Sequence, residues 1–232
     1  MSRALWLCSW YPHPDSPYEG DFVQRHAKAV SAFIPVTVFY VSQGGPSKER
    51  EKEIRTRHSD GNLEENIVLF QFKKTGFRWL DVLLYNIRYL AVYKSIIRKY
   101  IDEHGKPDVV HVHVPMKAGM VARWVNRTWN LSYIVSEQSS HYVRGSKDDF
   151  FEKSLRHRSN VKKVFSEAAA VTNVSGIIGN TLRQAFSLPS VTVVHNTVDT
   201  SVFYYQPHQL EKFRFIHVST LSPHHKNIQG IL

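Results

Sequence analysis

Short apolar runs alternate with longer segments of helical periodicity along most of this chain. The short runs consist mostly of valine, isoleucine and other apolar residues, which is typical of parallel strands buried on both faces. Because parallel strands need a crossover between them, the alternation predicts an α/β fold with a Rossmann-like, doubly wound parallel sheet. The expected strands are residues 3–9, 36–41, 67–72, 108–112, 132–136, 169–173 and 191–194. The expected helices are residues 20–33, 79–103, 116–129, 176–186 and a stretch that ends at 167.

Two segments leave alternatives open. Residues 42–65 are polar and carry a mixed run of charges, which predicts a long surface loop or a ragged hairpin. The helix expected over 79–103 has two apolar stripes, and the tyrosine-rich stripe, which basic residues flank, could contact a membrane surface or a lipid acceptor. The favoured interpretation places this helix between the sheet and a neighbour, with tyrosine hydroxyls reaching water. The first stripe contains Leu80, Leu83, Leu84, Ile87 and Leu90, and the second contains Tyr85, Tyr89, Tyr93, Ile96 and Tyr100.

The chain changes character after residue 205. Residues 206–212 are polar and predict a linker, 213–218 are apolar and predict a new strand, and 219–226 are a polar turn. A strand and a turn cannot bury a core of their own. We therefore expect residues 1–205 to form one domain, and residues 206–232 to form a linker with the first strand and turn of a second, truncated domain. A site built between two such domains would be half present, so we expect this chain alone to be inactive.

The charge balance is the one unusual property of the composition, with 30 Lys and Arg against 20 Asp and Glu and a net charge of +10. It favours acidic partners, such as phosphorylated small molecules, anionic lipid surfaces or nucleic acid. The single cysteine, Cys8, excludes an intrachain disulfide and suits a reducing compartment. Neither a signal peptide nor an apolar run of about 18 residues is evident, so we expect a cytoplasmic location, with peripheral contact to the inner membrane face left open.

In a doubly wound sheet, ligands bind beyond the carboxyl ends of the strands, so the loops there are candidate sites. The first such loop ends in Gly20, at an expected helix start, where free backbone N–H groups could bind a phosphate or a sugar hydroxyl. The alternative is that Gly20 only allows the turn. No G-x-G-x-x-G motif is present, so a dinucleotide fingerprint is not supported.

A pair of histidines marks a second candidate site. His111 and His113 are two residues apart, so they share one face of the strand at 108–112 and its end. We expect His111 to be a core histidine. His113 is better placed to be open to a ligand, as a proton donor or hydrogen-bond partner. A zinc site is the competing interpretation, but no third and fourth ligands follow at a recognisable spacing.

Polar residues follow two further strands. Glu137 and Gln138 come directly after the strand at 132–136, among serines, where a carboxylate could bind sugar hydroxyls or act as an acid or base. A capped, hydrogen-bonded loop would have the same residue types. A nucleophilic serine is not supported, because no G-x-S-x-G motif precedes His141. Lys226 lies in the turn after the last expected strand, a position suited to binding phosphate.

Four groups of motifs, in chain order, resemble glycosyltransferase family 4, whose members are retaining enzymes with a GT-B fold. The resemblance covers essentially the whole chain. The motifs are residues 9–12 with 19–27, residues 107–113, residues 196–199 with Phe203, and residues 217–221 with 226–228.

This resemblance implies that the chain is the N-terminal half of a GT-B fold, in which two Rossmann-like domains face each other across a cleft. The N-terminal domain binds mainly the acceptor, a glycan or a lipid-linked glycan, and the C-terminal domain binds the nucleotide-sugar donor. No metal and no cofactor are implied. By motif, Gly20 would place backbone N–H groups near the donor phosphates or the acceptor, and His113 would approach the transferred sugar. Lys226 would bind the donor diphosphate, and we expect structural roles for Asn196 and Asp199.

The chain departs from the family pattern at three places. Thr220 stands where the family often has an arginine, and Gln138 stands where a histidine commonly follows Glu137. The paired-glutamate motif of the donor domain is absent from this chain. Two other functions remain open: a sugar-nucleotide 2-epimerase on the same architecture, and a non-enzymatic module that binds polyanions. Nucleic acid is the less favoured partner, because the aromatic residues lie in apolar periodic segments instead of forming a stacking platform.

Overall fold

The computed structural model describes residues 2–44, 53–146, 148–207, 215–219 and 228–230. The described residues form an eight-stranded sheet in the order β3-β4-β2-β1-β5-β6-β7-β8. Every neighbouring pair is parallel except β3 and β4, so the predicted doubly wound α/β fold is confirmed. The strands are β1 (Ala4–Cys8), β2 (Val36–Gln43), β3 (Glu53–Asp60), β4 (Leu63–Phe70), β5 (Val109–His113), β6 (Tyr133–Glu137), β7 (Ala170–Asn173) and β8 (Thr192–Val193).

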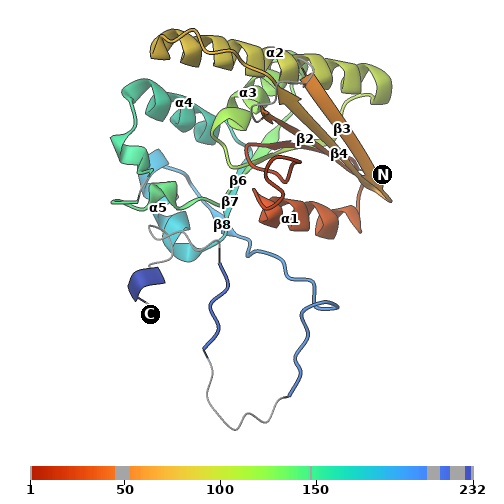
Figure 1. Ribbon diagram of the computed structural model, residues 1–232, viewed down its shortest axis with the longest axis vertical. Helices are drawn as coiled ribbons and strands as arrows, with labels where there is room; N and C mark the ends of the chain where they lie inside the picture. Colours follow the sequence, from red (N-terminus) through yellow and green to blue (C-terminus); the bar gives the residue numbers. More distant parts are fainter. Residues whose placement is uncertain (1, 45–52, 147, 208–214, 220–227, 231–232) are drawn as a thin grey trace.

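Five α-helices connect these strands, together with short 3-10 turns (Figure 1). The helices are α1 (Asp21–Ser31), α2 (Arg78–His104), α3 (Lys117–Trp129), α4 (Leu155–Ser166) and α5 (Gly176–Phe186), and the 3-10 turns are η1 (Ser140–Tyr142), η2 (Phe150–Glu152) and η3 (Ile228–Gly230). The order of strands reverses beside β1: the chain first adds strands on the β2 side and then returns through α2 to add β5 on the other side. In open α/β sheets the ligand crevice lies at such a switch point, beyond the carboxyl ends of the two central strands.

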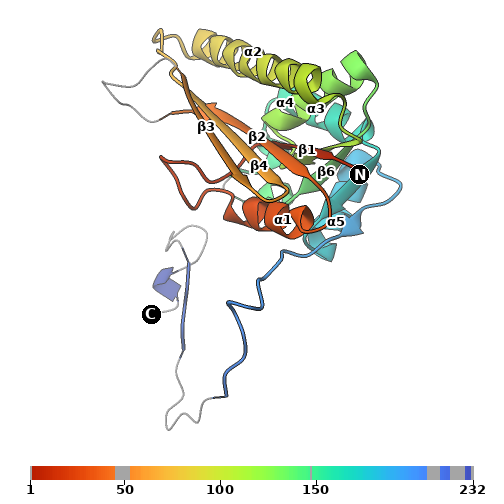
Figure 2. The ribbon, with the colours of Figure 1, turned by 90° about the vertical axis from the view of Figure 1, so that its right-hand side faces the viewer.

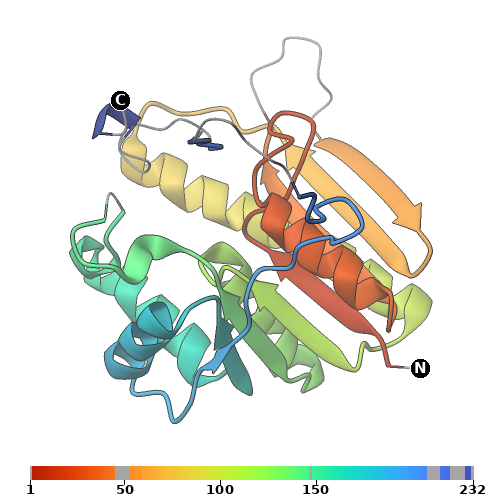
Figure 3. The same cartoon turned by 90° about the horizontal axis from the view of Figure 1, so that it is seen from below.

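The central strand β1 is buried on both faces, which explains its continuous apolar sequence. Leu5 and Leu7 belong to the core that α2 and α3 cover, whereas Trp6 and Cys8 belong to the core that α1 covers. The segment that follows β8 returns across the α1 face, where the Asn196 side chain contacts His26 at 3.3 Å (Figure 3). The two cores therefore enclose the carboxyl ends of β1 and β5 from both sides.

The long helix α2 places its tyrosine stripe in the core. Tyr89, Tyr93 and Tyr100 are buried against the sheet, so the expected packing of this helix on the sheet is confirmed, and the membrane contact considered for the tyrosine stripe is wrong. The expectation that its tyrosine hydroxyls reach water is wrong for Tyr93, whose hydroxyl donates to the carbonyls of Cys8 and Phe39 at 3.0 Å each. The leucine stripe is partly exposed, which its apolar sequence does not predict. Because 27 residues of helix extend about 40 Å, the first turns of α2 reach beyond the short strands and leave Leu83 and Ile87 exposed.

The segment expected as a loop or ragged hairpin contains two regular strands. β3 pairs with β4 along eight residues in antiparallel register. The described side chains of β3 are exposed, because this strand has a neighbour on one side and no helix over it (Figure 2). A polar edge strand gives no apolar alternation, and its charges oppose pairing with another molecule. The sequence pattern therefore could not show it.

The strand expected at 213–218 is not seen in its described part. Residues 215–218 are assigned to no strand and are exposed, because no neighbouring strand lies beside them among the residues that the structure describes. Residues 213 and 214 lie outside that range. As for the membrane, no described helix combines the length and the apolar character that a crossing would require.

Candidate functional site at the sheet switch point

The loop after β1 turns sharply at Gly20 to begin α1. Gly20 has φ +66° and ψ 25°. A Cβ atom there would lie 2.6 Å from the carbonyl carbon of Trp10 and 2.7 Å from the backbone nitrogen of Tyr11. Only glycine fits both this left-handed backbone and the close approach. The turn therefore has a structural reason for its glycine, and it also sets the free N–H groups of the first turn of α1 beside the carboxyl end of β1.

A buried carboxylate fixes the position of this loop. Glu65 on β4 is 4% exposed and accepts hydrogen bonds from the Tyr11 hydroxyl at 2.5 Å and the Gln24 amide at 2.8 Å. Farther along the loop, Glu19 contacts the His13 ring at 3.3 Å and accepts a hydrogen bond from the Tyr40 hydroxyl at 3.4 Å. The loop is thus tied to the sheet at both ends.

His113 ends β5 and is 1% exposed, so the expectation that it is open to a ligand is wrong for this structure. Its ring stacks on Trp6 with the centroids 4.0 Å apart and lies 4.2 Å from the ring of His111. Neither ring nitrogen has a hydrogen-bond partner. Burial lowers the pKa of His113 well below its usual value, and the neighbouring His111 adds to this effect. The side chain is therefore a neutral imidazole with both nitrogens unused.

His111 is partly buried and hydrogen-bonded, so of the two rings it is His113, and not the expected His111, that is the more buried. The Nε2 atom of His111 lies 2.7 Å from the Ser136 hydroxyl, which in turn lies 2.6 Å from the Thr172 hydroxyl. Burial lowers its pKa to about 4, so this ring is also neutral. The two rings touch, but His111 has a hydrogen-bond partner and His113 has none.

The residue after His113 has a strained backbone. Val114 has φ +59°, a left-handed conformation that costs a β-branched residue free energy. It is fully buried, and its N–H donates to the Ser136 carbonyl at 2.9 Å. Strain of this kind collects at functional sites. It directs the chain away from β5 immediately behind the His113 ring.

Glu137 ends β6 and is fully buried. Its Oε1 atom accepts the backbone N–H groups of Gln138 and Ser139, each at 2.8 Å. Its Oε2 atom has no hydrogen-bond partner. Burial raises the pKa of Glu137 to about 7, although the backbone N–H and the hydroxyl of Ser139 act in the opposite direction. The carboxyl is therefore poised to hold or release a proton near neutral pH.

The strand register brings these side chains to one edge of the sheet. Cys8 is paired with His113, His113 with Ser136, and Glu137 with Asn173 at the end of β7. We call His113, Glu137, Gln138, Ser139 and Asn173 the switch-point cluster. It contains six of the ten buried side-chain polar atoms that lack a hydrogen-bond partner in the described residues. Buried polar atoms are normally paired, so this concentration points to a site that a polar ligand completes.

Two loops meet over the end of β5. The Trp10 ring, in the loop after β1, makes an edge contact with the His141 ring, in the loop after β6, with the centroids 5.8 Å apart. Because β5 lies between β1 and β6, this contact spans the strand end that carries His113.

The predicted site residues fall into two groups. The structure places His113, Glu137 and Gln138 at the carboxyl edge, with His113 on the face of the sheet that α1 covers and Glu137 on the opposite face, and Gly20 follows the neighbouring strand β1. Lys226 lies outside the described residues. The sequence analysis did not single out Trp6, Val114 or Asn173. Only Asn173 could have been found from the sequence, because it is a polar residue at the end of an expected strand. No group of three or more His, Cys, Asp or Glu side chains is arranged to hold a metal within the described ranges.

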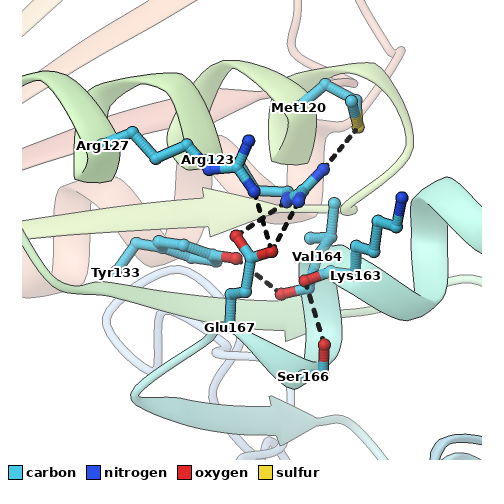
Figure 4. Close-up of polar contacts among 8 residues, drawn as sticks. All are labelled: Met120, Arg123, Arg127, Tyr133, Lys163, Val164, Ser166 and Glu167. Atoms are coloured by element: carbon cyan, nitrogen blue, oxygen red, sulfur yellow. Dashed lines mark hydrogen bonds and ion pairs between the residues drawn. The ribbon is translucent and has the colours of Figure 1, made fainter.

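A second polar cluster lies at the opposite end of the sheet (Figure 4). Arg123 on α3 is largely buried and donates to both carboxylate oxygens of Glu167, at 2.8 and 2.5 Å. Arg127 reaches the same carboxylate at 3.2 Å, and the Tyr133 hydroxyl donates to the Val164 carbonyl at 2.7 Å. We call Arg123, Arg127, Tyr133 and Glu167 the paired cluster. Its hydrogen bonds join α3 to the end of α4, which is a structural role.

The comparisons with known proteins agree with this architecture. The model for Glycosyltransferase Family 4 matches residues 21–202. Sucrose-phosphate synthase from Thermosynechococcus elongatus is similar over 88% of this chain and 50% of its own, with 12% identity and a TM-score of 0.58. The E. coli trehalose-6-phosphate protein bound with UDP-2-fluoro glucose matches over 80% of this chain and 42% of its own, with 12% identity and a TM-score of 0.50.

A third structure, Arabidopsis thaliana UGT89C1 complexed with UDP-L-rhamnose, covers 83% of this chain and 51% of its own, with 9% identity and a TM-score of 0.50. The chain thus spans about half the length of these structures, and at such identities the likeness shows the fold. A comparison with curated proteins gave no match. The family model, however, covers well over half of the sequence, so the chain belongs to glycosyltransferase family 4.

Proposed function

We propose that the protein containing this chain transfers a sugar, with retention of configuration, from a nucleotide-sugar donor to a glycan or lipid-linked acceptor. The observation that carries the proposal is the switch-point cluster, a set of buried polar atoms without partners at the edge where α/β folds bind ligands. Family membership supports glycosyl transfer. Two similar structures are bound to UDP-sugars, which supports a nucleotide sugar as donor.

In this proposal His113 binds the sugar that is being transferred. Its neutral ring offers one donor and one acceptor nitrogen, and the stack on Trp6 holds the ring plane fixed. Glu137 binds an acceptor hydroxyl through Oε2 while Oε1 stays anchored on backbone N–H groups. With a pKa of about 7 it can take up or release a proton as the acceptor reacts. Gln138 adds a further hydrogen-bond partner at the same edge.

The donor side of the proposal rests on residues that this chain contributes only in part. Free N–H groups at Gly20 would face the donor phosphates or the acceptor, and Lys226 would bind the diphosphate. Residues 1–232 alone would then lack most of the donor pocket and would not turn over. A lipid-linked acceptor would further place the protein at the cytoplasmic face of a membrane, in the synthesis of an envelope polysaccharide.

The test is sugar transfer by the full-length protein with a panel of nucleotide sugars and lipid-linked glycans. We expect transfer with one donor, and at least a hundredfold loss of rate in His113→Ala and in Lys226→Ala. Wild-type rates in both variants would overturn the site assignment. The same reactions without acceptor serve as the control, because conversion of the nucleotide sugar alone would instead identify a 2-epimerase.

A further inference from the structure

The first turns of α2 expose large apolar side chains in a row. We call residues 77–88 the α2 overhang. Phe77, Trp79, Val82, Leu83 and Ile87 are between 43% and 71% exposed. From Trp79 to Ile87 they recur every three or four residues, which places them on one side of the helix. Soluble proteins rarely expose several large apolar side chains side by side, so this surface is typical of an interaction site.

Core packing does not require these side chains. The buried stripe of α2 consists of Tyr89 and residues farther along the helix, up to Ile101. The outward face of that second half is charged, with Lys94, Arg98 and Lys99. The apolar outward surface is thus confined to the half of α2 that extends past the sheet.

The start of the overhang is held in a defined position. The Asp81 carboxylate accepts hydrogen bonds from the backbone N–H of Thr75 at 2.6 Å and from its hydroxyl at 2.7 Å. The Thr75 hydroxyl in turn accepts the N–H of Phe77 at 3.2 Å. These bonds tie the segment before the helix to its first turn and fix Phe77 beside it. The apolar side chains are therefore presented on a firm helix end, and not on a loose loop.

The rim of this surface is basic. Lys73, Lys74, Arg78 and Arg88 are all exposed around it. Asp81 is the sole acidic residue in the sequence from 71 to 101, and its carboxylate is engaged by Thr75. An apolar face with a basic rim complements an anionic lipid surface, where acyl chains meet negatively charged headgroups.

The overhang lies near the candidate site. Lys117, the first residue of α3 and four positions after His113, places its ammonium 4.0 Å from the ring centre of Tyr85 and 5.7 Å from that of Tyr89. The start of α3 at the carboxyl edge therefore contacts α2 just behind the exposed turns. A surface bound at the overhang would lie next to the edge that carries the switch-point cluster.

We propose that the α2 overhang is the membrane-docking surface of this protein, with Phe77, Trp79, Leu83 and Ile87 inserted among the headgroups of an anionic bilayer. The basic rim supplies the attraction to the lipid phosphates. This identifies a surface different from the tyrosine stripe, which is buried. Its purpose, the delivery of a lipid-linked acceptor, rests on the proposed function, but the docking itself does not.

The experiment is sedimentation of the full-length protein with phosphatidylcholine vesicles, with and without phosphatidylglycerol. We expect binding to the anionic vesicles that falls with added salt. The variant Trp79→Ser/Leu83→Ser/Ile87→Ser should bind at least tenfold more weakly, and Lys74→Gln/Arg78→Gln should lose about fivefold for each charge removed. The matched control is Arg98→Gln/Lys99→Gln, which removes two charges from the other half of the same helix and should change binding by less than either variant.

A second readout locates the contact. Lipids brominated in the acyl chain should quench tryptophan fluorescence on binding, and Trp79→Phe should remove most of that quenching while it keeps binding. Wild-type binding by the serine variant, equal losses in the control, or unaltered quenching in Trp79→Phe would each overturn the proposal. A protein dimer that the serine variant disrupts, without vesicle binding, would do so as well. Because no sugar transfer is measured, a failed transferase assay would leave this result standing.

Discussion

The switch-point cluster and the paired cluster are both polar and each contains buried side chains, yet they lie at opposite ends of one sheet and differ in whether their polar atoms have hydrogen-bond partners. In the paired cluster, the hydrogen bonds between Arg123 and Glu167 raise the pKa of Arg123 and lower that of Glu167. In the switch-point cluster, burial raises the pKa of Glu137 and lowers that of His113. One environment stabilises charge and the other penalises it. The difference separates groups that hold the fold together from groups that are kept for a ligand.

The two clusters should differ in how the stability of the fold responds when one polar group is removed. Removing a partner from the paired cluster leaves a charge uncompensated and should destabilise the fold. Removing a polar atom from the switch-point cluster takes away a group that has no partner to lose, so stability should stay the same or rise. Activity should change in the reverse order, as is usual where function is maintained at a cost to stability.

His113→Phe should give the largest effect. The phenyl ring keeps the stack on Trp6 but removes both unpaired nitrogens. We expect the rate of sugar transfer by the full-length protein to fall at least a hundredfold, while the free energy of unfolding rises by about 1 kcal/mol. Initial rates and urea unfolding measure the two quantities. A destabilised variant would show that His113 is held by contacts that the described residues do not reveal.

Glu137→Gln should change how stability depends on pH. In the native protein Glu137 keeps its proton up to a pKa of about 7, whereas in the unfolded chain it ionises near pH 4.5. Between these values the native state holds more protons, so wild-type stability falls as pH rises and levels off above pH 7. The amide cannot ionise. The variant should therefore gain about 3 kcal/mol relative to wild type from pH 4.5 to pH 7.5.

Urea unfolding of both proteins at several pH values provides the measurement. Other groups titrate equally in the two proteins, so the difference between the curves isolates Glu137. Parallel curves would show that this carboxyl ionises normally, and would remove its role as a proton carrier near neutral pH.

Glu167→Gln should destabilise the fold by about 2 kcal/mol, because it leaves the buried Arg123 guanidinium without its anionic partner. The side chain of Glu167 is 32% exposed, which lets water soften the loss. Arg123→Met is the matched control and should cost less, since Glu167 keeps Arg127 and solvent. Thermal unfolding measured for both variants tests the order. A larger loss in Arg123→Met would mean that packing, and not the ion pair, dominates this cluster.

The smallest effects come from two single hydroxyls. Tyr133→Phe removes a buried donor that is bonded to the Val164 carbonyl and should cost about 1 kcal/mol. Ser139→Ala removes a buried hydroxyl that makes no well-formed hydrogen bond but lies close enough to Glu137 to lower the pKa of that carboxyl, so it should cost less than Tyr133→Phe. Urea unfolding of the two variants side by side gives the comparison. Equal losses would erase the distinction between the two clusters.

The sheet and its helices were predictable because their signals are local. A strand such as Val36–Gln43 is mostly apolar and buried, and a helix such as Gly176–Phe186 follows its capping Ser175, whose side chain accepts the N–H of Ile178. The edge strand Glu53–Asp60 was not predictable, because one neighbour on one side suffices to hold it and polar side chains can face water. The exposure of Leu83 and Ile87 was hidden for another reason: it depends on where the sheet ends beneath α2.

The residues of the candidate site were predictable from the sequence, but their burial and their contacts were not. The ends of β5 and β6 gave His113 and Glu137, since polar residues that follow buried strands stand out in the sequence. Their burial, the stack on Trp6 and the strained backbone of Val114 arise from contacts between distant segments. No spacing rule carries that information. Lys226 stays a prediction from the resemblance alone.

The most direct test of the account is the relation between activity and stability across four variants of the full-length protein. His113→Phe and Ser139→Ala alter the switch-point cluster, and Tyr133→Phe and Glu167→Gln alter the paired cluster. Initial rates of sugar transfer are measured at a temperature where all four remain folded. We expect His113→Phe to lose at least a hundredfold in rate without losing stability, whereas Glu167→Gln loses stability and keeps its rate within a few fold. Rates that fall in proportion to stability in both clusters would contradict the account.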